Sequence, residues 1–389
     1  MRSFAVFLTV FLGLYALVHA YAYLAIHRSF SPKGGRRLAI LATLAFLLVA
    51  PVLGHAVGAR GMDGLSSAIL LAGYEWMALL FLFVSAQLLA DAFRLLGFLA
   101  GRAAGRDVFP APAGRLLFTG AAAAAVAAFG YGHLEARGLR VERIELTTSR
   151  VPDHADGFRV VQISDLHLSA VNSARTAERV AERVASLKPD LLVATGDVVD
   201  RGMADPALVA RALRSIEAPL GKFAVTGNHE FYRGIDASVR FLERAGFRVL
   251  RGEEARPAPW LSILGVDDEA AHRFEGPRGA PLGTLLDRVP GGRWVLLLHH
   301  RPEVDDASRG RVDLQLSGHT HGGQIFPFGL VVALAYPFLK GTHDLGGGSL
   351  LHVSRGTGTW GPRVRVGSPP EITLIELRGR RPESIDPDP

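Results

Sequence analysis

Long uncharged apolar segments occupy the first third of the chain, and shorter apolar runs separated by polar turns occupy the remainder. Residues 4–26 and 38–59 carry no formal charge, and each exceeds the roughly 20 residues that a helix needs to cross a bilayer. Residues 66–90 and the alanine-rich run 116–131 are further candidate spans. The pattern predicts an all-α transmembrane bundle of about four helices over residues 1–135, with three spans as the alternative count.

Two features of this region have competing interpretations. Residues 4–26 could form a cleaved signal peptide, but the apolar region is longer than usual for that purpose and further spans follow. Glu75, within the third span, marks either an intramembrane functional site or a carboxylate near an interface or the bundle interior. Its neighbours Tyr74 and Trp76 favour the structural interpretation.

Basic side chains predict the orientation of the bundle, because positive loops stay on the cytoplasmic side. Two clusters of basic residues carry this prediction. The first follows the first span and contains Arg28, Lys33, Arg36 and Arg37. The second lies between the third and fourth spans and contains Arg94, Arg102, Arg106 and Arg115. With four spans, the C-terminal part then lies outside the cytoplasm. Basic residues after the last span oppose this orientation, and the loss of one span would reverse it.

Composition restricts the chemistry of the remaining chain. The chain has no cysteine, which excludes disulfides, iron–sulfur clusters and thiolate zinc sites, so a metal would be held by His, Asn and carboxylates. The net charge of +6 belongs to the first 133 residues, because the remainder holds 33 basic and 33 acidic side chains. We therefore expect no nucleic-acid partner.

From about Arg140 the pattern is typical of an α/β domain. Apolar runs predict strands at 158–163, 191–194, 223–225 and 294–298, and residues 176–187 read as an amphipathic helix. The apolar face of that helix consists of Ala177, Val180, Ala181 and Val184. We expect a linker and first strand at 136–156, the catalytic domain at 157–379 and a flexible tail at 380–389.

Five polar clusters follow along this domain, and most of them stand beside glycine at the end of a predicted strand. They contain Asp165 and His167; Asp197 and Asp200; Asn228 and His229; His299 and His300; and His319 and His321. Ligand sites of α/β folds lie at such strand ends. In extended chain, residues two apart share a face, so a DxH or HxH triplet can hold one ion. Each cluster alone is more typical of a turn or a structural histidine, but all of them together predict a metal site.

The five blocks resemble the signature of the calcineurin-like metallophosphoesterases, and the similarity is greatest to the membrane-associated or exported bacterial branch. The resemblance covers about residues 157–377 and implies a four-layer α/β/β/α sandwich. It places Asp165, His167 and His321 on one metal and Asn228, His300 and His319 on the other, with Asp197 as the bridge. In the family the ligand histidine usually lies two residues before a proline, as His300 does before Pro302, so the resemblance implies that His300 is the ligand and that His299 lies behind the ligands.

The resemblance also implies roles outside the ligand set. His229 would contact the phosphate or protonate the leaving oxygen, oriented by Asp200, for which a turn cap is the alternative. Arg355 is a candidate phosphate contact or an ordinary surface arginine. Imidazole, amide and carboxylate ligands favour two divalent ions from among Mn, Fe, Zn and Co over Mg or Ca.

The resulting prediction is a membrane-anchored dinuclear phosphoesterase that hydrolyses a phosphomonoester, phosphodiester or pyrophosphate. A lipid-linked substrate is one option, since relatives include the UDP-2,3-diacylglucosamine pyrophosphatases of lipid A synthesis. A membrane sensor or transporter with a regulatory phosphoesterase domain is a second hypothesis, and a catalytically inactive metal-binding module is a third. The short loops of the first 135 residues count against the sensor or transporter. The complete ligand set counts against the inactive module.

Overall fold

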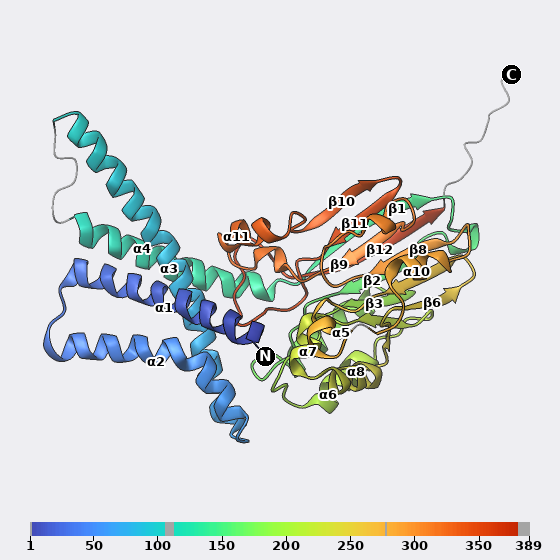
Figure 1. Ribbon diagram of the computed structural model, residues 1–389, viewed down its shortest axis with the longest axis horizontal. Coiled ribbons are helices and arrows are strands. Elements are labelled where there is room, and N and C mark those ends of the chain that lie inside the picture. The colour runs from blue at the N-terminus through green and yellow to red at the C-terminus, as the bar shows by residue number, and fades with distance from the viewer. Residues whose placement is uncertain (1, 106–112, 277, 380–389) are drawn as a thin grey trace. The chain divides into compact units, whose positions relative to one another are not determined.

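The computed structural model describes residues 2–105, 113–276 and 278–379 (Figure 1). The predicted tail at 380–389 and Arg106 of the second basic group lie outside the described residues. The chain divides into two compact units. The first contains the residues up to Glu135 together with the short segment Gly361–Val366, and the second begins at Ala136 and contains the rest.

Four helices of the first unit are long and apolar enough to cross a membrane. They are α1 (Arg2–Phe30), α2 (Gly34–Gly58), α3 (Asp63–Ala103) and α4 (Ala113–Arg137). Helix α3 has 41 residues and continues well beyond the predicted span 66–90. At 1.5 Å per residue it is roughly 60 Å long, about twice the thickness of a bilayer core.

Helices α2 and α3 approach each other closely at two glycines. A Cβ atom on Gly54 would lie 2.6 Å from Cγ of Leu70, and one on Gly73 would lie 3.1 Å from Cβ of Ala50. Small residues allow this approach, which is how helices gain packing energy where lipid removes the hydrophobic drive for association.

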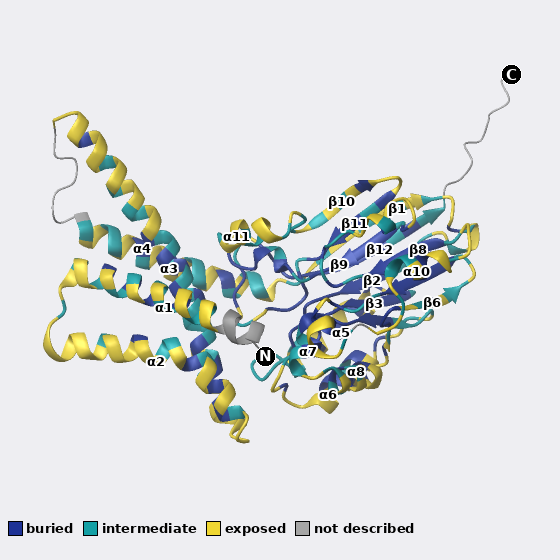
Figure 2. Cartoon of the chain, in the orientation of Figure 1, coloured by how far each residue is buried: buried dark blue, intermediate teal, exposed yellow. Residues whose placement is uncertain are grey.

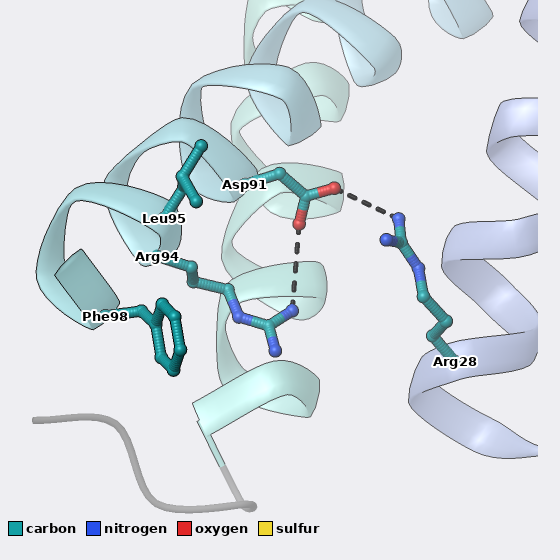
Figure 3. A pocket seen from close by; sticks show the side chains of 5 residues that line it. All are labelled: Arg28, Asp91, Arg94, Leu95 and Phe98. Atoms are coloured by element: carbon teal, nitrogen blue, oxygen red, sulfur yellow. Dashed lines mark hydrogen bonds and ion pairs between the residues drawn. The ribbon is translucent and has the colours of Figure 1, made fainter. Parts of the chain in front are cut away.

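Two acidic side chains of α3, Asp91 and Glu75, lie opposite basic partners within the first unit. Figure 3 shows Asp91 between Arg28 and Arg94, at 3.0 and 3.7 Å respectively, in a pocket that none of the predicted metal ligands lines. Glu75 lies 3.0 Å from Nε2 of His133 and 3.4 Å from Nε of Arg363. These partners offset the cost of placing carboxylates in an apolar helix.

The second unit contains two six-stranded sheets. The first sheet has the order β1 (Arg140–Thr148), β12 (Glu371–Gly379), β2 (Phe158–Ile163), β3 (Leu191–Thr195), β4 (Lys222–Val225) and β5 (Arg248–Val249). The second has the order β10 (Gly341–Gly346), β11 (Ser349–Val353), β9 (Leu314–Ser317), β8 (Trp294–Leu298), β7 (Leu261–Gly265) and β6 (Glu253–Ala258). Strands β2, β3 and β4 run parallel, as do β7, β8 and β9.

Alternating side chains of these strands bury two faces, as period-two patterning requires. Val160 of β2 packs between the sheets with Leu296 of β8, whereas its neighbour Val161 packs against the helices that cover the first sheet. Figure 2 shows the strands as the most buried part of this unit. The covering helices are α5 (Ala174–Ser186), α6 (Pro206–Arg214) and α8 (Ile235–Arg244).

Helix α10 (Leu282–Asp287) covers the second sheet through Leu285 and Leu286, which completes four layers. The predicted α/β/β/α sandwich behind a bundle of apolar helices is therefore confirmed. The amphipathic pattern of 176–187 is confirmed as well, since all four apolar positions that it named are the buried residues of α5.

Candidate metal centre

The predicted metal ligands follow the carboxyl ends of five strands from both sheets. Strands β2, β3 and β4 lead to Asp165, Asp197 and Asn228, while β8 and β9 lead to His300 and His319. The structure brings all seven predicted ligands to one place. Asp165, His167 and His321 present donor atoms within 4.8 Å of one another, and so do Asp197, His300 and His319. The amide oxygen of Asn228 lies 3.3 Å from Nε2 of His300.

Asp197 lies between these two groups. Its Oδ2 atom is 3.3 Å from Nε2 of His300 and 3.8 Å from Nε2 of His167. On the outer sides, Nε2 of His321 is 3.0 Å from Nε2 of His167, and Nδ1 of His319 is 3.2 Å from Nε2 of His300. One carboxylate oxygen therefore faces both histidine groups, which suits a bridging ligand.

Several ligands have left-handed backbone conformations, with φ values of 52° at Asp165, 47° at His167, 52° at Asp197, 70° at His319 and 51° at His321. This conformation costs an L residue roughly 1–2 kcal/mol, and such strain gathers at functional sites. The pairs Asp165/His167 and His319/His321 therefore converge through sharp bends. The extended geometry assumed from the sequence is wrong for them.

Glycines beside the ligands leave room for carboxylate oxygens. A Cβ atom on Gly227 would lie 2.2 Å from Oδ1 of Asp197, and one on Gly318 would lie 2.2 Å from Oδ2 of Asp165. No heavy atom fits at these distances, so any larger residue would displace a ligand. Space, rather than backbone flexibility, requires glycine at these two positions.

Hydrogen bonds select the nitrogen that two of the histidines, His300 and His167, present to a cation. The Nδ1–H of His300 donates to the carbonyl oxygen of Thr195 at 2.8 Å, which leaves Nε2 as the donor atom for a metal. Nδ1 of His167 lies 3.2 Å from Asp200, so Nε2, which faces His321 and Asp197, is again the atom available to a metal. Burial lowers the pKa of His319 to about 3, which keeps its imidazole neutral and able to ligate.

Asp200 contacts two histidines through one carboxylate. Besides His167, it hydrogen-bonds Nδ1 of His229, whose ring lies with its centroid 4.7 Å from that of His167. Burial alone would lower the pKa of His229, but Asp197 and Asp200 outweigh it and raise the pKa to about 9. His229 lies at the edge of the site, hydrogen-bonded to Asp200 and beside the predicted ligands.

The field of the buried carboxylates favours positive charge at His300 as well as at His229. Burial would lower the pKa of His300, yet Asp197 and Asp165 raise it to about 10. Burial also disfavours ionisation of Asp165 and raises its pKa. The same field attracts divalent cations, and His, Asn and Asp donors form a set that such cations accept.

Glu230 and Tyr336 contribute to the site, although sequence reasoning gave neither a role. The carboxylate of Glu230 accepts hydrogen bonds from the backbone N–H groups of Asp197, Val198 and Gly227 at 2.9, 2.8 and 2.7 Å, and so holds two ligand loops together. A Glu two residues after Asn228 was a visible signal for it. The Tyr336 hydroxyl lies 2.9 Å from Nε2 of His319, and no sequence motif indicated this contact.

Two further predicted residues lie apart from the ligand groups. Nη2 of Arg355 contacts Glu371 at 2.6 Å and Glu142 at 3.1 Å, so carboxylates occupy the guanidinium that was expected to reach a phosphate. Burial lowers the pKa of His299, which is not among the clustered donors of the described residues. We carry neither residue into the proposed chemistry.

Comparison with known proteins identifies the family. The family model for calcineurin-like phosphoesterases matches residues 158–323. An uncharacterized metallophosphoesterase of Aquifex aeolicus (strain VF5) is 39% identical over 251 residues, which cover 64% of this chain and 96% of that protein. The chain belongs to the calcineurin-like phosphoesterases. As a member of this family it is a hydrolase that acts on phosphoesters, and the family implies divalent metal ions.

Two other relatives differ in the share of their own length that the match covers. The metallophosphoesterase YkuE of Bacillus subtilis (strain 168) is 34% identical, with a match that covers 66% of this chain and 93% of that protein. A transmembrane protein with metallophosphoesterase domain from Danio rerio is 29% identical, and the match covers 61% of this chain. This phosphoesterase spans just over half of the Danio rerio protein, 57%.

Proposed function

We propose that this phosphoesterase is a membrane-anchored enzyme with a dinuclear metal centre. Asp165, His167 and His321 hold one ion, and Asn228, His300 and His319 hold the other. The observation that carries the proposal is the position of Asp197, whose Oδ2 atom faces Nε2 of both His167 and His300. A carboxylate between two donor groups serves two ions at once.

The donor set argues for particular metals. Four imidazoles, two carboxylates and one amide are the seven donors. Calcium and magnesium prefer shells made entirely of oxygen, so Mn, Fe, Zn or Co fit this site better. The tautomers support ligation, because Thr195 and Asp200 each engage the Nδ1 atom of a histidine whose Nε2 atom faces the site.

The reaction is hydrolysis of a phosphomonoester, phosphodiester or pyrophosphate. Two bound divalent ions supply Lewis acidity that neutralises the phosphate and activates the attacking water. His229, protonated by its contact with Asp200, contacts the phosphate and donates a proton to the leaving oxygen. Its ring lies 6.1 Å, centroid to centroid, from that of Trp360, which borders the same side of the site.

The anchor and its orientation restrict the substrate. The described basic residues Arg28, Lys33, Arg94 and Arg102 favour a cytoplasmic location for the loops after α1 and α3. With four membrane-spanning helices, the catalytic unit then lies outside the cytoplasm. Substrates that are exposed on that membrane face, including lipid-linked phosphoesters, are favoured over freely diffusing cytoplasmic nucleotides.

Assays of the full-length protein in nanodiscs test this proposal. The protein is stripped with EDTA and then assayed with p-nitrophenyl phosphate and its bis ester, before and after Mn²⁺ is restored. We expect hydrolysis only after metal is restored, and elemental analysis should find about two ions per chain. The assay is repeated with Fe, Zn and Co in place of Mn. A preparation that holds one ion, or that hydrolyses neither ester with Mn, Fe, Zn or Co, would contradict the proposal.

A further inference from the structure

An uncharged segment interrupts the catalytic unit directly after the last metal ligands. Residues 325–339 contain no charged side chain, and helix α11 (Phe328–Ala335) forms their middle part. No residue of α11 is buried, although apart from Gly329 every one of them is apolar. An apolar helix that is exposed along its length loses free energy in water, so it indicates an interaction surface.

The exposure of this segment is large. Leu330, Val331 and Leu334 are 67%, 57% and 87% exposed, and Phe326 just before the helix is 63% exposed. Figure 2 shows α11 mainly in the colour of exposed residues. Leu330, Val331 and Leu334 lie within about 100° of one another around the helix axis, and the exposed Phe328 and Ala333 widen this exposed face to more than half of the helix circumference.

The segment is joined directly to the metal centre. At its end, the Tyr336 hydroxyl lies 2.9 Å from Nε2 of His319 and accepts a 2.7 Å hydrogen bond from Nη1 of Arg301. The Thr320 hydroxyl, between two ligands, donates to the carbonyl oxygen of Leu339 at 2.6 Å. The apolar helix therefore has a defined position beside the site.

A second exposed apolar side chain lies near the site, next to His229. Trp360 is 48% exposed, and two hydrogen bonds connect its backbone to the side chain of Gln324, at 3.0 and 2.9 Å. Gln324 directly precedes the apolar segment in the chain. Exposed apolar groups thus adjoin the metal centre beside both His319 and His229.

Three properties of α11 favour a lipid bilayer over a protein groove. A helix that docks in a groove needs one apolar stripe, whereas a helix immersed in acyl chains is apolar all round. Its eight residues span roughly 12 Å, too short to cross a bilayer core but long enough to enter one leaflet. Aromatic residues and Lys340 flank it, as at membrane interfaces, and the four apolar helices of the same chain keep a bilayer within reach.

We infer that residues 326–339 insert into one leaflet and present the metal centre to phosphoesters carried by lipids at that surface. The substrate class follows from the position, because the ligand His319 contacts the segment that enters the lipid. This inference rests on the proposed phosphoesterase function for the chemistry, but the insertion itself can be measured without turnover.

Site-specific fluorescence tests the insertion, and the absence of native cysteine makes single labelling direct. Leu334→Cys and Leu330→Cys are made in the full-length chain, labelled with an environment-sensitive fluorophore, and reconstituted in vesicles of phosphatidylcholine and phosphatidylglycerol. Leu208→Cys on α6, a 38% exposed leucine of the same unit, is the matched control. Nitroxides on the acyl chains should quench the labels at 330 and 334 strongly and the label at 208 weakly.

Other quenching patterns would overturn the inference. If the label at 334 is quenched no more than the label at 208, the helix does not enter lipid. If it is shielded from both acyl-chain nitroxides and aqueous iodide, a protein covers the helix instead. An enzyme that shows the expected quenching but hydrolyses no phosphoester would contradict the proposed function alone.

Kinetics of a charged variant test the substrate class. Leu334→Asp should lower the rate on phosphatidic acid in vesicles relative to the rate on p-nitrophenyl phosphate by roughly 10-fold, the value of one buried leucine side chain. Leu208→Asp is the control and should leave this ratio near that of the wild type. An unchanged ratio in Leu334→Asp would overturn the lipid-borne substrate.

Discussion

The hydroxyl of Tyr336 lies 2.9 Å from Nε2 of His319, although the two residues come from separate parts of the loop between β9 and β10. When Nδ1 of His319 binds a metal, its Nε2–H donates to the phenol oxygen, which also accepts from Arg301. A partner of this kind sets the tautomer and the ring orientation of a ligand. The apolar segment thus supplies a positioning residue for the proposed metal centre.

Tyr336→Phe should weaken binding of the ion held by His319 by roughly 10–100-fold, because the ligand loses the partner that orients it. Metal affinity measured by competition with a chelator checks this. Tyr232→Phe is the control, since Tyr232 contacts His229 through its ring, with centroids 5.3 Å apart. Equal affinities in the two variants would remove the positioning role.

Asp197→Asn should abolish turnover and weaken both metals, because one oxygen of Asp197 faces the two donor groups and an amide loses its charge. Asp313→Asn is the matched control, because its carboxylate forms an ion pair with Arg150. Asp313 directly precedes β9, whereas His319 follows it, so the two residues lie at opposite ends of that strand. Elemental analysis and the p-nitrophenyl phosphate assay decide the matter. Loss of only one ion in Asp197→Asn would exclude the bridge.

His229→Ala should retain both metals and lose rate on the order of 10²–10⁴-fold, the usual contribution of a positioned general acid. Asp200→Asn should behave differently, because Asp200 contacts His167 as well as His229. It should lower metal affinity together with the rate. Loss of bound metal in His229→Ala, or full activity in it, would overturn this division of roles.

His300→Ala should empty one metal position, while His299→Ala should leave both occupied. The two side chains are adjacent in the sequence, but only His300 lies among the clustered donors, 3.3 Å from Asp197. Counting metal per chain by elemental analysis separates the two variants. The reverse result would exchange the assignments.

An alkaline phosphatase reporter fused after Pro389 should be active, and a fluorescent reporter that folds only in the cytoplasm should stay dark there. The reason is the basic character of the predicted cytoplasmic loops, which places the catalytic unit on the opposite side. Detection of the fusion by immunoblot is the control. An inactive phosphatase fusion that is present at full length would reverse the orientation and favour a cytoplasmic lipid A precursor as substrate.

Much of the fold could be predicted because its signals are local. The strand 158–163 is a short, largely apolar run, and the helix 176–187 shows its buried face as a period in the sequence, so both follow from neighbouring residues. The polar clusters were visible for the same reason, since each follows a strand within a few residues. Helix α11 was missed, because a short apolar run after a ligand motif can equally be a buried strand or helix.

The sequence by itself determined which residues could serve as ligands, because side-chain chemistry and order along the chain are written in it. Only the tertiary structure decided how they meet: Asp165 and His167 converge through left-handed bends, and Asp197 reaches donors from both sheets. It also decided that Asp200 contacts two histidines and that Gly227 leaves space for a carboxylate oxygen. The contacts of Asp197, Asp200 and Gly227 join residues distant in sequence, and their geometry is set by the packing of two sheets, which no local pattern encodes.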